Sequence, residues 1–76
     1  MMAGMSNSLP VTVGAAVRAE MARKGIFQQH VADVLGVTRQ SVSRRLTGEI
    51  PFDVGELERV ADLLNVPLSR FLEVAA

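Results

Sequence analysis

The chain has 76 residues, which is enough for one domain with a small hydrophobic core. An apolar fraction of 49% supports such a core, while the absence of cysteine excludes disulfides and thiolate metal sites. No apolar run approaches the roughly 18 residues of a membrane span, and the N-terminus lacks a positively charged leader, so we expect a cytoplasmic protein with no membrane partner.

The formal net charge is zero, but charge is divided unevenly along the chain. Residues 1–48 carry six Lys or Arg and two acidic residues, whereas residues 49–76 carry two Arg and six acidic residues. A basic half and an acidic half are typical of a protein that presents one face to phosphate. The alternative is that both halves are ordinary solvated helix faces.

Residues 1–11 contain Gly, Ser, Asn and Pro without any periodicity. We expect a mobile tail there, or an arm that contacts DNA or a partner subunit, followed by one domain over residues 12–76. Thr12 is the predicted N-cap of a first helix that ends near Lys24. Its buried face is predicted from a spacing of four between Val13, Val17 and Met21.

Residues 28–48 predict two short helices separated by Gly36, a residue that ends helices at low cost. Thr38 is the predicted N-cap of the second of these helices. Four apolar residues define the buried faces of the pair: Val31, Leu35, Val42 and Leu46. The other side of the second helix is polar and carries Arg39, Gln40, Ser41, Ser43, Arg44 and Thr47. A DNA-reading helix must be built in this way, with one buried face and one face of hydrogen-bond donors.

Residues 49–76 predict two more helices. Asp53 and Glu56 have the spacing of a capping box, which begins a fourth helix that ends around Asn65. Pro67 opens a short fifth helix, whose inward face is predicted to be Leu68, Phe71, Leu72 and Ala75. The chain is therefore predicted to be all-α, with five helices and no strand.

Catalytic and metal sites are not indicated. His30 is the single histidine, and the chain has no cysteine, so neither a second histidine nor a thiolate can complete a metal site with it. The acidic residues are spread along helix surfaces, and Ser41 and Ser43 have no general base at a fixed spacing. We therefore expect a protein that is not an enzyme and has no cofactor, no metal and no small-molecule substrate.

The order and spacing of many residues resemble those of the lambda-repressor and Cro-like helix-turn-helix family. Within that family the chain most resembles small phage or prophage immunity repressors. The resemblance spans roughly residues 12–75 and implies a compact five-helix bundle, with the third helix in the major groove of DNA. It is carried by Gln28, Ala32, Leu35-Gly36-Val37-Thr38, Val42-Ser43-Arg44 and Gly48, then Leu57, Val60-Ala61, Leu64-Asn65-Val66-Pro67 and Phe71-Leu72.

The resemblance also implies roles for single residues. Base edges are read from three positions of the third helix, which are Arg39, Gln40 and Arg44 here. Gln28 matches a family glutamine that holds phosphate and buttresses the reading residues. The remaining backbone or supporting contacts are expected from Thr38, Ser41, Ser43, Arg45 and Thr47.

Three positions depart from the family pattern. Phe27 stands where the second helix usually has a polar cap. Arg45 stands where an apolar or aromatic residue is frequent, and we expect it to turn outward to phosphate. Met21 and Leu46 stand where many members pair Arg with Glu, so an apolar contact is expected to replace an ion pair.

The function implied is a sequence-specific transcriptional regulator, a repressor that binds a double-stranded DNA operator. Homodimer formation on a palindrome would double the number of base pairs read. Two alternatives stay open: an antitoxin-like autoregulator that binds DNA and a partner protein, and a helix-turn-helix module used only for protein interaction.

Overall fold

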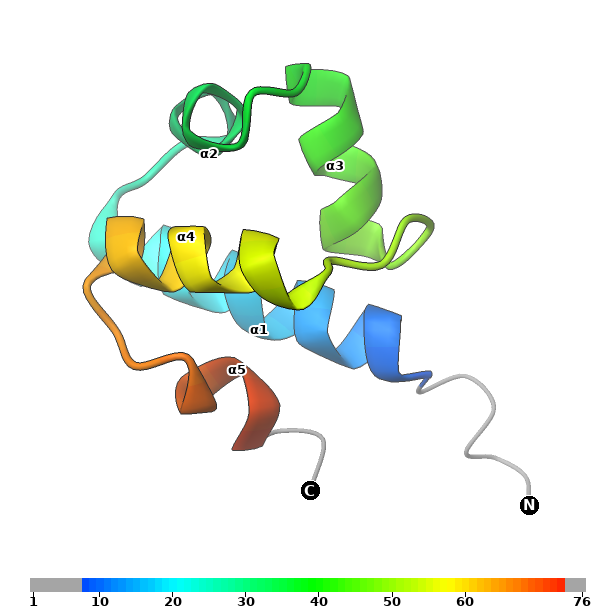
Figure 1. Ribbon diagram of the computed structural model, residues 1–76, viewed down its shortest axis with the longest axis vertical. Coiled ribbons are helices and arrows are strands. Elements are labelled where there is room, and N and C mark those ends of the chain that lie inside the picture. Colours follow the sequence, from blue (N-terminus) through cyan, green and yellow to red (C-terminus); the bar gives the residue numbers. More distant parts are fainter. Residues whose placement is uncertain (1–7, 74–76) are drawn as a thin grey trace.

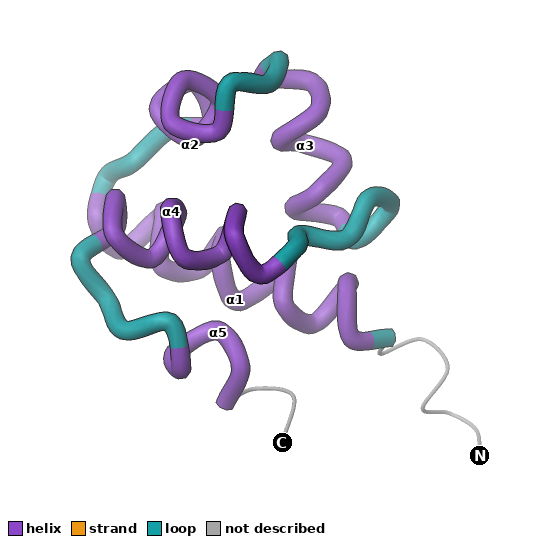
Figure 2. The backbone as a smooth tube through the Cα atoms, viewed as in Figure 1, coloured by secondary structure: helices purple, strands orange, loops and turns teal. Residues whose placement is uncertain are grey.

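The computed structural model describes residues 8–73, and these fold into five α-helices with no strand in that range, as predicted. The helices are α1 (Leu9–Lys24), α2 (Gln28–Leu35), α3 (Arg39–Thr47), α4 (Val54–Leu64) and α5 (Ser69–Glu73). Figure 1 shows α2 and α3 at one end of the molecule and α5 at the opposite end. Short loops join all five, including the tight turn between α2 and α3 (Figure 2). No described helix has the length and apolar character of a membrane span.

The core lies where the apolar faces of the helices meet. α1 packs against α3, α4 and α5, and α2 packs against α3 and α4. The buried faces predicted for the first three helices are confirmed, and the apolar residues Leu57, Val60, Ala61 and Leu64 of α4 are buried as well. On α5 the prediction is only partly right, since Phe71 is fully buried but Leu72 is 47% exposed. The predicted pair Met21 and Leu46 is buried as expected, with 5% of each residue exposed.

The first helix begins at Leu9, three residues before the start predicted at Thr12. Pro10 is compatible with a helix start, since the amides of the first turn have no partner within the helix. Thr12 lies inside the helix, where its hydroxyl donates to the Ser8 carbonyl oxygen at 3.1 Å. The predicted cap is therefore wrong, and the last three residues of the predicted tail are helical. The first seven residues of that tail lie outside the described part of the chain.

The remaining predicted caps are confirmed. The Thr38 hydroxyl oxygen accepts the amide N–H of Ser41 at 3.0 Å, at the start of α3. At the start of α4, Asp53 Oδ1 accepts the Glu56 amide at 2.7 Å and Glu56 Oε1 accepts the Asp53 amide at 3.2 Å. Asn65 closes α4 with a φ of 58°. The Thr38 cap fixes where α3 begins, and the other two caps fix where α4 begins and ends.

Two glycines let α1 and the end of α3 approach at backbone distance. A Cβ atom built on Gly14 would lie 2.5 Å from the Leu46 carbonyl oxygen and 2.7 Å from that of Arg45. Gly48, which ends α3 with a φ of 88°, would place a Cβ atom 2.6 Å from a side-chain atom of Val11. The end of α3 is thus fixed against α1, and its first turn lies at the end of the molecule where α2 lies (Figure 1).

Candidate nucleic-acid interface

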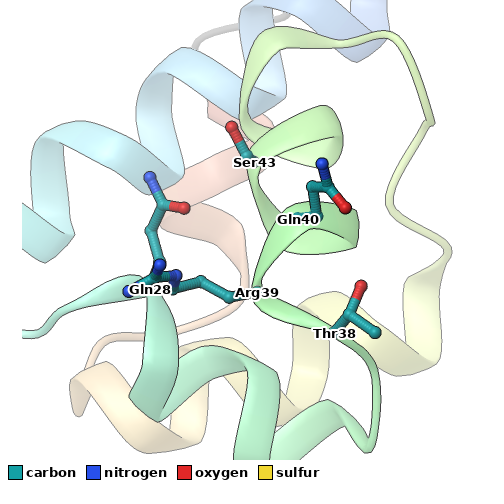
Figure 3. A pocket seen from close by; sticks show the side chains of 5 residues that line it. All are labelled: Gln28, Thr38, Arg39, Gln40 and Ser43. Carbon is teal, nitrogen blue, oxygen red and sulfur yellow. The ribbon is translucent and has the colours of Figure 1, made fainter.

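The first turn of α3 and the start of α2 form a hollow of about 470 Å³, called the α3 hollow below. It is lined by Gln28, Thr38, Arg39, Gln40 and Ser43. Figure 3 shows Arg39 extending from α3 toward Gln28, with Gln40 and Ser43 on the same side of α3. Five of the nine residues predicted to contact DNA line the hollow, four from α3 or its cap and one from α2, so the turn at Gly36 brings these five together.

Four of the five side chains that line the α3 hollow are free to bind a ligand. Arg39 and Gln40 are exposed, and Gln28 and Ser43 are half-buried. Within residues 8–73 these four side chains form no hydrogen bond and no ion pair. No acidic residue lines the hollow. The surface therefore offers uncompensated donors and one positive charge, which suits the edges of bases and the phosphates beside them.

Arg44 lies outside the α3 hollow, although it is on α3. Its Nε atom is 3.9 Å from Glu49 Oε2, and the two side chains are 55% and 67% exposed. An ion pair this open contributes about 0–1 kcal/mol, so a DNA acceptor can replace Glu49 at little cost. Thr47, near the end of the same helix, donates its hydroxyl to the Arg44 carbonyl oxygen at 3.0 Å.

The outward orientation predicted for Arg45 is wrong. Its Nε and Nη2 atoms donate to Glu56 Oε1 and Oε2, each at 3.1 Å, and 12% of the side chain is exposed. Its Nη1 atom donates to the Ser41 carbonyl oxygen at 3.2 Å and contacts the Ser41 hydroxyl. Arg45 is therefore engaged with Ser41 of its own helix and with Glu56 of α4.

Glu56 is the residue that the sequence reasoning missed at this surface. Its spacing from Asp53 indicated a capping box, and that box forms. The same carboxylate also binds Arg45, which is 11 residues away in the chain. Nothing in the local pattern of either residue signals the pairing, because it depends on the angle at which α3 meets α4.

Glu20 is the buried charged residue of the described core, with 3% exposed. Its Oε2 atom accepts hydrogen bonds from Arg23 and Arg70, each at 3.0 Å, while its Oε1 atom has no partner within residues 8–73. Burial acts to raise the pKa of this carboxyl, but the hydrogen bonds from Arg70 and Arg23 and their positive charges outweigh it, and the pKa lies below its ordinary value. The pair with Arg70 ties α1 to α5, away from the α3 hollow.

Titratable clusters that could hold a metal are absent from the described residues, where no group of three His, Cys, Asp or Glu side chains converges. His30 is exposed on α2, and its Nδ1 atom accepts the Phe27 amide N–H at 3.2 Å. This bond is the half of a capping box in which the N3 side chain accepts the amide of the N-cap residue, while Phe27 offers no side-chain acceptor to the first turn of α2.

The chain is similar in sequence to known proteins. Residues 12–73 match a protein-family model described as "Helix-turn-helix domain". The chain is also 29% identical over 69 residues to an uncharacterized HTH-type transcriptional regulator from Sinorhizobium medicae strain WSM419 and to another from Rhizobium meliloti strain 1021. Each alignment covers 91% of this chain and 50% of the relative, so the chain spans about half the length of these curated relatives.

Proposed function

The chain belongs to the helix-turn-helix domain family, and from this premise we propose that it is a sequence-specific transcriptional regulator that binds double-stranded DNA. The observation that carries the proposal is the α3 hollow, in which the side chains of Gln28, Arg39, Gln40 and Ser43 have no partner within residues 8–73. The names of the two relatives, both transcriptional regulators, support the same function.

In this proposal α3 enters the major groove with its first turn foremost. Arg39 can donate two hydrogen bonds to O6 and N7 of guanine, and Gln40 can form two with N6 and N7 of adenine. Arg44, one turn further along α3, reads a base after giving up its open pair with Glu49. Each such bidentate contact discriminates against a wrong base by about 1–3 kcal/mol.

The other polar residues of this surface hold the helix in the groove. In this proposal Gln28 holds a phosphate and supports Arg39, and the direction of the Arg39 side chain toward Gln28 favours this role. Thr38, Ser43 and Thr47 have hydroxyl groups at the rim of the proposed contact. Such contacts fix the register of the protein on DNA without reading sequence.

Arg45 has a different role in this proposal from the one predicted. Its guanidinium is bound by Glu56 and shielded from solvent, so it positions α3 rather than binding phosphate. Ser41, whose carbonyl and hydroxyl oxygens contact Arg45, belongs to the same set of supporting residues.

We assign the finer class on the resemblance to small phage or prophage immunity repressors, which supports a repressor. One reading helix contacts a short stretch of one groove, and two copies on a palindromic operator would bind more tightly and more selectively. The proposed assembly on DNA is therefore a homodimer.

A second candidate function is favoured by an apolar hollow of about 180 Å³ at the other end of the molecule. Leu9, Val54 and Leu72 line it and are 57%, 66% and 47% exposed. A surface of this kind suits an antitoxin-like autoregulator that binds both DNA and a partner protein. Sedimentation of the operator complex tests the homodimer: we expect two copies per operator, and a single copy would contradict it.

Selection of bound sites from random double-stranded DNA tests the function directly. We expect one enriched motif arranged as a palindrome with fixed spacing, because α3 reads the same bases in each half-site. Enrichment without any shared motif would contradict sequence-specific reading, and no retention of DNA at low salt would contradict DNA binding altogether.

A further inference from the structure

A second hollow, of about 210 Å³, lies between α1 and the start of α2. It is called the α1 hollow below. Arg18 and Phe27 line it together with Gln28, and Met21 and Leu46 contribute apolar side chains. Because Gln28 also lines the α3 hollow, the two hollows adjoin, and a ligand that crosses the first continues into the second.

Arg18 gives the α1 hollow a positive charge that the protein does not neutralise. The side chain is exposed and forms no ion pair or hydrogen bond within residues 8–73. By contrast, Arg23 and Arg70 bind Glu20, and Arg45 binds Glu56. No acidic side chain lines the α1 hollow, so the charge of Arg18 is available to an anion.

Phe27 gives the same hollow an apolar rim. The residue is 71% exposed, the largest exposed fraction among the large hydrophobic residues of the described chain. Its ring stacks on His30 with 6.1 Å between the ring centroids and an angle of 18° between the planes, so the ring has a supported position. An exposed aromatic ring beside an unpaired arginine suits a ligand in which an apolar group lies within a few ångströms of an anionic group.

Resting on the proposed function, we infer that the α1 hollow is a second binding site for the same DNA, specific for the sugar–phosphate backbone. Arg18 binds a phosphate and Phe27 packs against a neighbouring deoxyribose. The DNA strand alternates these two groups, and the strand that passes Gln28 continues along this side of the protein. Contacts to phosphate and sugar add affinity on every sequence and leave base preference unchanged.

The test compares Arg18→Gln with Arg59→Gln in the full chain. Both changes remove one positive charge, but Arg59 lies on α4, lines neither hollow, and donates only to the Gly55 carbonyl oxygen of its own helix. Affinity for a selected operator is measured by fluorescence anisotropy over a series of salt concentrations. For Arg18→Gln we expect the slope of log affinity against log salt to fall by about 0.9, and for Arg59→Gln we expect the wild-type slope.

Two further measurements locate the contact. Phe27→Gly removes the ring while keeping a residue that N-cap positions tolerate, and it should weaken binding severalfold at an unchanged salt slope. Single methylphosphonate replacements along the operator remove one phosphate charge at a time. One position should weaken the wild-type protein and have no effect on Arg18→Gln. Thermal unfolding of each variant confirms that it is folded at the temperature of measurement.

The inference is overturned if Arg18→Gln and Arg59→Gln give the same slope, or if every methylphosphonate affects the wild type and Arg18→Gln alike. It is also overturned for the sugar contact if Phe27→Gly binds as the wild type does. In each of these cases an intact base preference of the wild-type protein leaves the proposed function standing, whereas loss of all DNA binding at low salt would remove both.

Discussion

Both carboxylate oxygens of Glu56 on α4 bind the guanidinium of Arg45 on α3, at 3.1 Å each. Glu56 Oε1 also accepts the Asp53 amide that begins α4. One side chain therefore links α3, the turn that follows it and α4. With the close approach of Gly14 to the end of α3, this link fixes the angle at which the first turn of α3 is presented.

The Arg45–Glu56 pair is predicted to couple in stability. The side chains are 12% and 13% exposed, and removing one partner leaves the other shielded from water and unpaired. A double-mutant cycle of Arg45→Met and Glu56→Gln, measured by chemical denaturation, should give a coupling free energy of about 0.5–3 kcal/mol. Additive effects of the two changes would contradict the link.

The same variant separates positioning from phosphate binding. Arg45→Met should lower operator affinity while keeping the wild-type salt slope, because a guanidinium held by Glu56 is not a phosphate contact. A slope that falls by about 0.9 would show that Arg45 leaves Glu56 and binds phosphate on DNA.

Gly14 is predicted to be intolerant of any side chain. Gly14→Ala forces a methyl group against the carbonyl oxygens of Leu46 and Arg45 and should destabilise the fold by about 1–3 kcal/mol, because helix backbones must move apart. Gly55→Ala is the matched control in α4, where the nearest atom to the new Cβ is an Asp53 carboxylate oxygen at 3.4 Å. Gly55→Ala should stabilise the fold slightly, by less than about 1 kcal/mol. Equal effects of the two changes on denaturant midpoints would contradict the close approach.

Glu20 is predicted to make stability depend on acid pH. Its pKa in the folded protein lies below the ordinary value of 4.5, so its contribution is complete above that value and is lost as pH falls through the lower folded pKa. Glu20→Gln should therefore be less stable than the wild type near neutral pH and should lose less stability on acidification. Glu58→Gln, which changes an exposed carboxylate on α4, is the control. Unfolding temperatures that shift in parallel for the wild type and Glu20→Gln would exclude the proposed dependence.

Much of the fold follows from local chemistry that can be seen in the sequence. Thr38 and the pair of Asp53 and Glu56 cap helices as predicted, since a cap acts within four residues. The buried faces follow from the spacing of apolar residues along each helix. The start of α1 was predicted too late, because a proline in the first turn is compatible with a helix and Thr12 bonds equally well from inside it.

Features that depend on the packing of distant helices could not be predicted in the same way. The pairs of Arg45 with Glu56 and of Glu20 with Arg70 join residues 11 and 50 positions apart. The exposure of Phe27 and its place beside Arg18 arise where α1 meets the start of α2. The spacing of residues along one helix contains no information about the angles at which distant helices pack. The grouping of Gln28 with Arg39 and Gln40 was found from sequence only because a known family arranges such residues together.

The central claim is that α3 reads base sequence, and Gln40 tests it most directly. Gln40→Ala is measured on the operator and on every single-base variant of one half-site, with Gln29→Ala as the control, since Gln29 is an exposed glutamine that bonds Asp33 and does not line the α3 hollow. For Gln40→Ala we predict a loss of about 1–3 kcal/mol on the operator and a relaxed preference at one base pair, with the other preferences unchanged. An affinity ranking of the variants identical to that of the wild type would contradict the claim, whatever the loss of overall affinity.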